Sequence, residues 1–217
     1  PNVPGRGEPI RLALEEAGVT YSDTASSSTD LIRSEMSDKN MGDTFNPPYS
    51  LHLSSGTVIG DKDGHGAYHV NELALTALDG LSNEVHETHH PIAVGLYYED
   101  QKEEAKKRAK DYRENRLPKF LGYFEKVLNG EASGDGPWLY GGKLTYADLV
   151  LFKTLDGVKF AFPKAVKTLH DSGNYNRVFI LYDAVKKRPK IKQYLESNRR
   201  QAYSNGIYRY YPELDNE

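Results

Sequence analysis

Apolar residues recur at helical spacing through nearly all of the chain after residue 65, and this periodicity restricts that part to a helical fold. Over residues 67–90 a single helix is predicted, because one stripe of apolar side chains follows its length. The stripe consists of Val70, Leu73, Leu78, Leu81 and Val85. Proline lacks the N–H that the helical ladder needs, so Pro91 ends or kinks this helix.

The same periodicity predicts further helices over residues 99–128, 144–162 and 176–195. The first of these is expected to bend before Pro118, and the last to contain one or two helices. Long helices joined by short connections form a bundle. We therefore expect residues 66–217 to be an all-helical domain.

The beginning of the chain follows a different pattern, with short elements rich in Ser, Gly, Pro and Asn. Residues 4–19 place a Gly-rich turn before an amphipathic helix, with Gly18 as its C-terminal cap. A short strand with a polar loop and then a strand–turn–strand unit are predicted over residues 20–30 and 45–60. Helix, strand and hairpin in this order are typical of a small α/β domain, which we assign to residues 1–65.

The charge balance argues against nucleic acid as the main partner. The chain carries 28 basic and 31 acidic residues, whereas proteins that bind a polyanion concentrate positive charge. The densest basic run, residues 106–108, follows Glu103 and Glu104 at helical spacing. We interpret this run as a solvated, ion-paired helix face.

Cysteine and membrane signals are absent from the sequence. Without cysteine, disulfides, thiol catalysis and cysteine-bound zinc are excluded. No apolar stretch approaches the roughly 20 residues that a membrane-spanning helix needs, and no signal-peptide pattern is present. We expect a cytoplasmic protein without a membrane partner.

Residues 86–90 read His-Glu-Thr-His-His and match the zinc pattern His-Glu-x-x-His. Two histidines four residues apart share a helix face and can bind zinc, while the glutamate activates a water. Three observations oppose this interpretation: Pro91 disrupts the helix, Thr88 and His89 are polar where a buried metal helix would be apolar, and no later motif supplies a third ligand. We expect a polar helix face of histidines and no metal.

Thr145 and Asp148 have the spacing of a capping box, and Leu144 and Leu149 that of a hydrophobic staple around it. In the stretch "PWLYGGKLTYADLVLF" this box follows an aromatic-Leu-x-Gly sequence in the second half of the chain. The stretch resembles the C-terminal domain of cytosolic glutathione transferases, in which the box begins the core helix of the bundle.

Other segments resemble the same family in the same order. "PGRGEPIRLALEEAGV" is similar to the turn and first helix of the family's thioredoxin-like domain, and "FNPPYSLHLSSGTVIG" to its cis-proline turn and hairpin. "ALDGLSNEV" resembles the Asp-Gly segment of the helix at the dimer interface, and residues 89–128 resemble filamentous-fungal members of the tyrosine-type branch. The resemblance implies a thioredoxin-like α/β domain followed by a helical bundle, assembled as a homodimer.

The activity that the resemblance implies is conjugation of the glutathione thiol to small hydrophobic electrophiles, a detoxification reaction. A thiol of pKa about 8.5 is mostly protonated at neutral pH, so the enzyme must favour the thiolate. In this branch a tyrosine at the end of the first strand does so. The chain begins at Pro1, in the turn after that strand, so we assign no catalytic residue. We expect the strand to precede Pro1, because a sheet without it would leave edges unpaired.

The resemblance also implies substrate-binding residues. Arg6 matches an arginine that supports the active-site turn. The residue before the cis-proline exchanges main-chain hydrogen bonds with the cysteinyl part of glutathione; this residue is Asn46 if Pro47 is cis, and Pro47 if Pro48 is cis. Because proline has no N–H to donate, Asn46 is the better candidate.

On the electrophile side, Tyr97 or Tyr98 falls where the branch often has a tyrosine. Asp79 is expected to order the helix interface rather than to touch glutathione. Gly60 and Asp61 depart from the family pattern, because they replace a Gln/Glu-Ser pair whose N–H groups hold the γ-glutamyl carboxylate. The alternative is therefore a non-catalytic binding or structural protein on the same fold.

Overall fold

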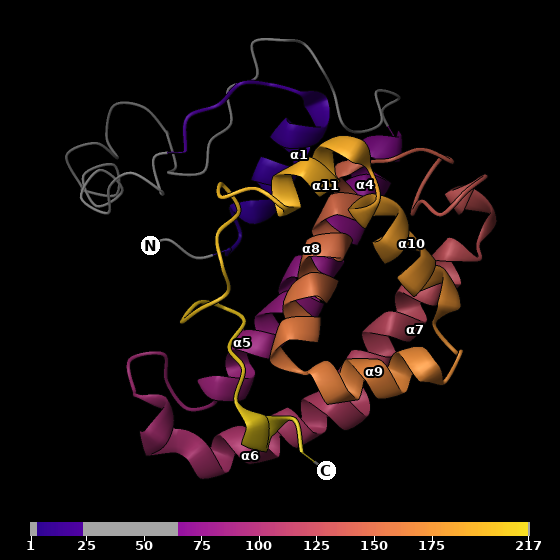
Figure 1. The fold of residues 1–217 in the computed structure, drawn as a ribbon. Helices are drawn as coiled ribbons and strands as arrows, with labels where there is room; N and C mark the ends of the chain where they lie inside the picture. The colour runs from indigo at the N-terminus through magenta and orange to yellow at the C-terminus, as the bar shows by residue number, and fades with distance from the viewer. Residues whose placement is uncertain (1–3, 24–64, 217) are drawn as a thin grey trace.

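The computed structural model describes residues 4–23 and 65–216, and within these ranges every regular element is a helix (Figure 1). The α-helices are α1 (Glu8–Ala17), α4 (His65–Leu75), α5 (Asn83–His89), α6 (Lys102–Asp111), α7 (Leu117–Leu128), α8 (Tyr146–Ala161), α9 (Pro163–Asp171), α10 (Asn176–Lys186) and α11 (Pro189–Leu195). Two π-helical segments are η1 (Thr76–Ser82) and η3 (Tyr112–Arg116). Short 3-10 helices are η2 (Tyr98–Gln101), η4 (Glu131–Ser133) and η5 (Pro212–Leu214).

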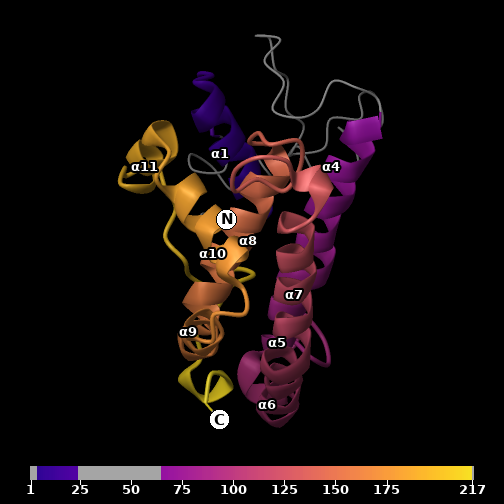
Figure 2. The same cartoon turned by 90° about the vertical axis from the view of Figure 1, so that its right-hand side faces the viewer.

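The predicted helical bundle is confirmed, and α8 is its central helix (Figures 1 and 2). Residues 147–155 of α8 are all buried, as expected for a helix that is apolar around most of its circumference. It packs against α1, α4, η1, α9 and α10. Figure 2 shows α4, α5 and α7 along one long side of the molecule and α10 and α11 along the other.

The single helix predicted over residues 67–90 is interrupted by η1. Of its apolar stripe, Val70, Leu73, Leu81 and Val85 are buried and Leu78 is partly buried. Within η1 the backbone changes to i→i+5 hydrogen bonding, a change that often marks a functional site. The predicted end before Pro91 is confirmed, because α5 stops at His89. The predicted bend before Pro118 corresponds to the second π-helical segment, η3.

Helix α9 is not predicted by the sequence pattern, because a distant residue supplies its N-terminal cap. Asp215 accepts hydrogen bonds from the backbone N–H groups of Lys164 at 2.7 Å and Ala165 at 3.1 Å. Such a cap satisfies donors that a helix start otherwise leaves unpaired. Fifty residues of chain separate the cap from the helix, so local patterning gives no sign of it.

The N-terminal part is described over α1 and its flanking residues. Gly18 adopts φ 72°, the left-handed conformation, and caps α1 as predicted. The predicted hairpin over residues 45–60 and most of the predicted strand over residues 20–30 lie outside the described residues. The α/β assignment of residues 1–65 therefore stays a prediction.

A membrane-spanning helix requires length and apolarity together. Among the described residues, no helix combines both to the extent needed to cross a bilayer.

Candidate functional site

Arg6 connects the N-terminal segment to the interrupted helix. It lies just before α1, and its guanidinium donates hydrogen bonds to Asp79 Oδ1 at 3.0 Å and Asn83 Oδ1 at 2.7 Å. Asp79 belongs to η1 and Asn83 begins α5, so both acceptors lie on one face of consecutive turns. Asp79 thus connects η1 to the segment before α1, and its expected role at the helix interface stays a prediction.

Beside Arg6, four segments enclose a small cavity, which we call the seam. It has a volume of about 10 Å³, comparable to one water molecule. The N-terminal segment, η1, α8 and the C-terminal segment contribute to it. Its lining residues are Gly5, Arg6, Pro9, Leu78, Ser82, Lys153, Thr154, Ile207 and Tyr208.

Lys153 gives the seam a buried positive charge. Its side chain is only 4% exposed, and Nζ donates a 2.9 Å hydrogen bond to Tyr203 Oη. Nζ also lies 4.6 Å and 4.3 Å from the ring centroids of Tyr203 and Tyr208. Burial lowers the pKa of Lys153 to about 8, although the negative charges of Asp156 and Glu8 act in the opposite direction.

Lys153 is not among the site residues predicted from the sequence, although a signal is present. It is the one charged residue within the apolar run of residues 149–153, inside a helix that is apolar on nearly every face. A lysine is rarely buried fully unless it is paired or functional, so this position could have been selected from the sequence.

Replacing Lys153 with methionine is expected to change the pH dependence of stability. The folded-state pKa of about 8 lies below the ordinary value of 10.5, so the unfolded state binds more protons between these values. Wild-type stability therefore gains from Lys153 deprotonation as pH rises, and methionine cannot contribute this gain. Between pH 7 and pH 9, the free energy of unfolding of the wild type should therefore rise by about 1 kcal/mol relative to that of the variant. Urea unfolding of both proteins measures it, and a constant difference would contradict the prediction.

Tyr208 closes the seam from the C-terminal segment. Its hydroxyl lies 2.8 Å from Ser82 Oγ of η1, and its side chain is 4% exposed. The two residues are 126 positions apart in the sequence. The last part of the chain therefore reaches back to the segment that holds Arg6.

The structure places the predicted tyrosines in another contact. Tyr97 is 83% exposed, whereas Tyr98 is buried and stacks on Tyr211 with 3.8 Å between ring centroids. The Tyr98 hydroxyl donates a 3.1 Å hydrogen bond to Glu213. Neither tyrosine is among the residues that line the seam with Arg6.

The remaining predicted binding residues, Asn46, Pro47 and Pro48, lie outside the described residues, as do Gly60 and Asp61. Their predicted roles stay predictions.

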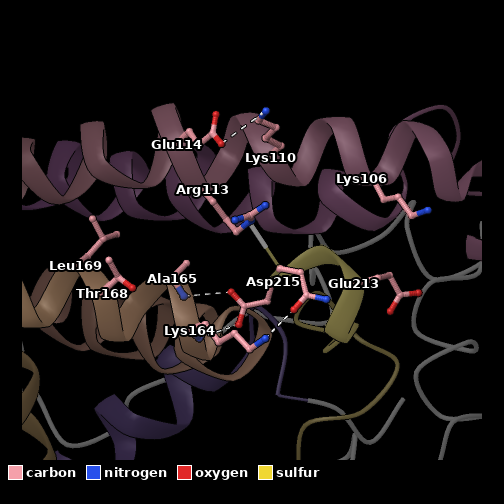
Figure 3. A pocket seen from close by; sticks show the side chains of 11 residues that line it. Lys106, Lys110, Arg113, Glu114, Lys164, Ala165, Thr168, Leu169, Glu213 and Asp215 are labelled. Atoms are coloured by element: carbon pink, nitrogen blue, oxygen red, sulfur yellow. Dashed lines mark hydrogen bonds and ion pairs between the residues drawn. The ribbon is translucent and has the colours of Figure 1, made fainter.

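A larger groove of about 930 Å³ lies between the α6–η3 region, α9 and the C-terminal segment (Figure 3). Its charged lining residues are Lys106, Lys110, Arg113, Lys164, Glu114, Glu213 and Asp215. Figure 3 shows these side chains around the groove, with Lys110 paired to Glu114. Lys164 Nζ also donates a 2.6 Å hydrogen bond to Asn216 Oδ1. Among the described residues, the groove and the seam share no lining residue. A wall with this many charges does not suit a hydrophobic ligand.

The comparison with protein families finds one match that covers about half of the chain. The sequence profile described as "Glutathione S-transferase, C-terminal domain" matches residues 86–198. Glutathione S-transferase 2 of Onchocerca volvulus is 25% identical over 199 residues, which cover 90% of this chain and 89% of that protein. The alignment with a glutathione S-transferase of Plasmodium falciparum is 30% identical over 90 residues and covers 40% of each chain.

Solved structures agree with the helical architecture. The sigma class glutathione transferase of Fasciola hepatica superimposes with a TM-score of 0.59 at 20% identity, covering 94% of both chains. At this identity the likeness shows the fold alone.

Proposed function

The chain belongs to the glutathione S-transferase family, and from this premise we propose that it conjugates the thiol of glutathione to small hydrophobic electrophiles. The observation that carries the proposal is the bond from Arg6 to Asp79 and Asn83, which joins the segment before α1 to the helical part beside the seam. It connects the predicted thioredoxin-like domain, on which the family is expected to hold glutathione, to the helices that are expected to contact the electrophile.

The proposed reaction requires a thiolate. A glutathione thiol of pKa about 8.5 needs stabilisation of its anion to react at neutral pH. Arg6 is paired with Asp79, and the seam has room for about one water molecule, so neither Arg6 nor Lys153 is proposed to contact the sulfur. The hydrogen-bond donor to sulfur is assigned to no described residue.

The rest of the proposed site lies in the predicted thioredoxin-like domain. In this proposal residues 1–65 form that domain, and Asn46, Pro47 and Pro48 contribute the turn that contacts the cysteinyl part of glutathione. Tyr97, with its exposed ring, is available to an electrophile, whereas Tyr98 would first have to leave Tyr211.

The proposal predicts that the purified protein binds glutathione in a calorimetric titration, with micromolar to low millimolar affinity. Replacing Arg6 with alanine should weaken binding about tenfold, because the junction loses two charge-assisted hydrogen bonds. Stability should change by less than about 1 kcal/mol, because the Arg6–Asp79 pair is solvent-exposed. Arg199→Ala, which removes another exposed arginine paired with Glu15, is the control and should leave glutathione binding unchanged.

Two failures of this experiment can be told apart. A folded wild-type protein that produces no heat at several millimolar glutathione would contradict the proposed activity and favour the non-catalytic alternative. Wild-type binding that is unaffected by Arg6→Ala would retain the activity and remove Arg6 from the site. Turnover of an electrophile by the binding-competent protein then completes the test.

We also propose that the protein is a homodimer that associates through α4. Tyr68 and Leu75 are two helical turns apart on this helix and are 77% and 47% exposed. Light scattering should give a mass near twice 24.4 kDa, and Tyr68→Glu should shift the protein toward the monomer. A monomeric wild type at micromolar concentration would contradict this proposal.

A further inference from the structure

Three histidines converge at the C-terminal end of α5. His86, His89 and His90 each offer one ring nitrogen, and these nitrogens lie within 4.8 Å of one another. The three pairs of ring centroids are 4.9–5.1 Å apart. The sequence pattern paired His86 with His90 and left His89 without a role, whereas the structure brings the His89 ring equally close to both as a third potential ligand.

The three histidines were expected to form a polar helix face, but His89 is buried. It is only 1% exposed, and among the described residues neither Nδ1 nor Nε2 has a hydrogen-bond partner. The Val85 carbonyl is near enough to favour a proton on this ring, but neither ring nitrogen meets hydrogen-bond geometry with it. A buried polar group without a partner costs about 1–3 kcal/mol, so the ring lacks the contact that its burial requires.

We propose that His86, His89 and His90 bind one late first-row divalent metal ion of the Zn²⁺ or Ni²⁺ class. Neutral imidazole is a preferred ligand of these ions. Bonds of about 2.0–2.1 Å require the three nitrogens to move closer together than they now lie. The half-buried rings of His86 and His90 can rotate to provide this, while the buried His89 stays fixed.

The surroundings of the cluster support neutral ligands. Burial and the nearby Arg209 guanidinium lower the pKa of His89 to about 2, and burial also lowers the pKa values of His86 and His90. The imidazoles are therefore unprotonated at neutral pH, as metal binding requires.

The proposed ion is a bound ligand and takes no part in conjugation. Glu87, which a catalytic zinc pattern would use as general base, forms an ion pair with Arg108. Arg209 is the opposing charge near the cluster, where it donates hydrogen bonds to the Gly206 and Asn205 carbonyls. Its positive charge should weaken metal binding, so a variant without this charge should bind the metal ion more tightly.

The test is a titration of the full chain with Zn²⁺ against a chromophoric chelator. The wild type should bind about one ion in competition with the chelator, and the double variant His86→Ala, His90→Ala should bind more than about 100-fold more weakly. Arg209→Gln should bind more tightly than the wild type. His170→Ala removes an exposed histidine on α9 and should have no effect.

Thermal unfolding provides the second measurement, because a ligand that binds the folded state raises its melting temperature. Zn²⁺ should raise the melting temperature of the wild type and not that of the double variant, whose substitutions leave His89 in place. Equal Zn²⁺ affinity in the wild type and the double variant would overturn the proposal by showing that the ion binds elsewhere. Absence of competition by the folded wild type would overturn it as well.

Discussion

Replacing Asp148 with alanine is expected to lower the free energy of unfolding by about 3 kcal/mol. The Asp148 side chain is fully buried and accepts hydrogen bonds from Leu139 N at 2.8 Å, Thr145 N at 2.6 Å and Thr145 Oγ1 at 3.0 Å. Burial raises its pKa to about 6, so at neutral pH it is still the carboxylate that accepts all three. Alanine would remove the carboxylate half of the capping box, with the Thr145 side chain kept, and would leave two buried backbone N–H groups without a partner.

Equilibrium urea unfolding measures this loss, and two variants separate its causes. Asp148→Asn keeps the size of the side chain and one oxygen acceptor, so it should lose about half as much. Asp183→Ala removes an exposed aspartate of α10 that lies 3.9 Å from Lys187, and it should change stability by less than about 0.5 kcal/mol. A loss below about 1 kcal/mol for Asp148→Ala would contradict the role given to the box.

The capping box was predictable because all its determinants are local. Thr145 and Asp148 are three residues apart, and the helix they start is buried along its apolar positions. The same is true of Gly18 at the end of α1, where a left-handed cap follows directly from an amphipathic stretch. Interactions within one or two helical turns determine both features, so the sequence alone predicts them and the structure contains them.

The candidate site was less predictable, because its contacts join distant segments. Arg6 meets Asp79 across 73 residues, and Ser82 meets Tyr208 across 126. Neither a period nor a spacing encodes such pairs. The resemblance to the family selected Arg6, and a charged residue in an apolar helix marks Lys153, whereas Tyr208 emerged only from the packing of α8 against the C-terminal segment.

The sequence pattern predicted only part of the histidine cluster, for a different reason. A pattern at spacing four assigns His86 and His90 to one face, and this part is correct. The pattern also gives no ligand role to the positions between them. However, α5 ends at His89, and the backbone of His90 leaves the helix with φ −132°. The three rings meet because the helix stops there, which a regular helical wheel does not represent.

The second large effect is expected at Gly157, where a Gly→Ala change should destabilise the protein by about 2 kcal/mol. In the interior of a helix this substitution ordinarily stabilises by about 0.5–1 kcal/mol. Here a Cβ would lie 2.4–2.5 Å from three atoms of the Tyr208 ring. The ring cannot move away freely, because it is buried and its hydroxyl is bonded to Ser82. Urea unfolding of the variant measures the loss.

Gly122 in α7 provides the matched control, since a Cβ there would meet only Tyr175, at 3.9 Å. Gly122→Ala should therefore stabilise by about 0.5–1 kcal/mol, opposite in sign to Gly157→Ala. Gly157→Ala combined with Tyr208→Ala should recover part of the loss relative to Tyr208→Ala alone, because the added methyl group then occupies vacated space. If Gly157→Ala stabilises the protein like Gly122→Ala, then Tyr208 does not hold the C-terminal segment against α8, and the seam is not closed from that side.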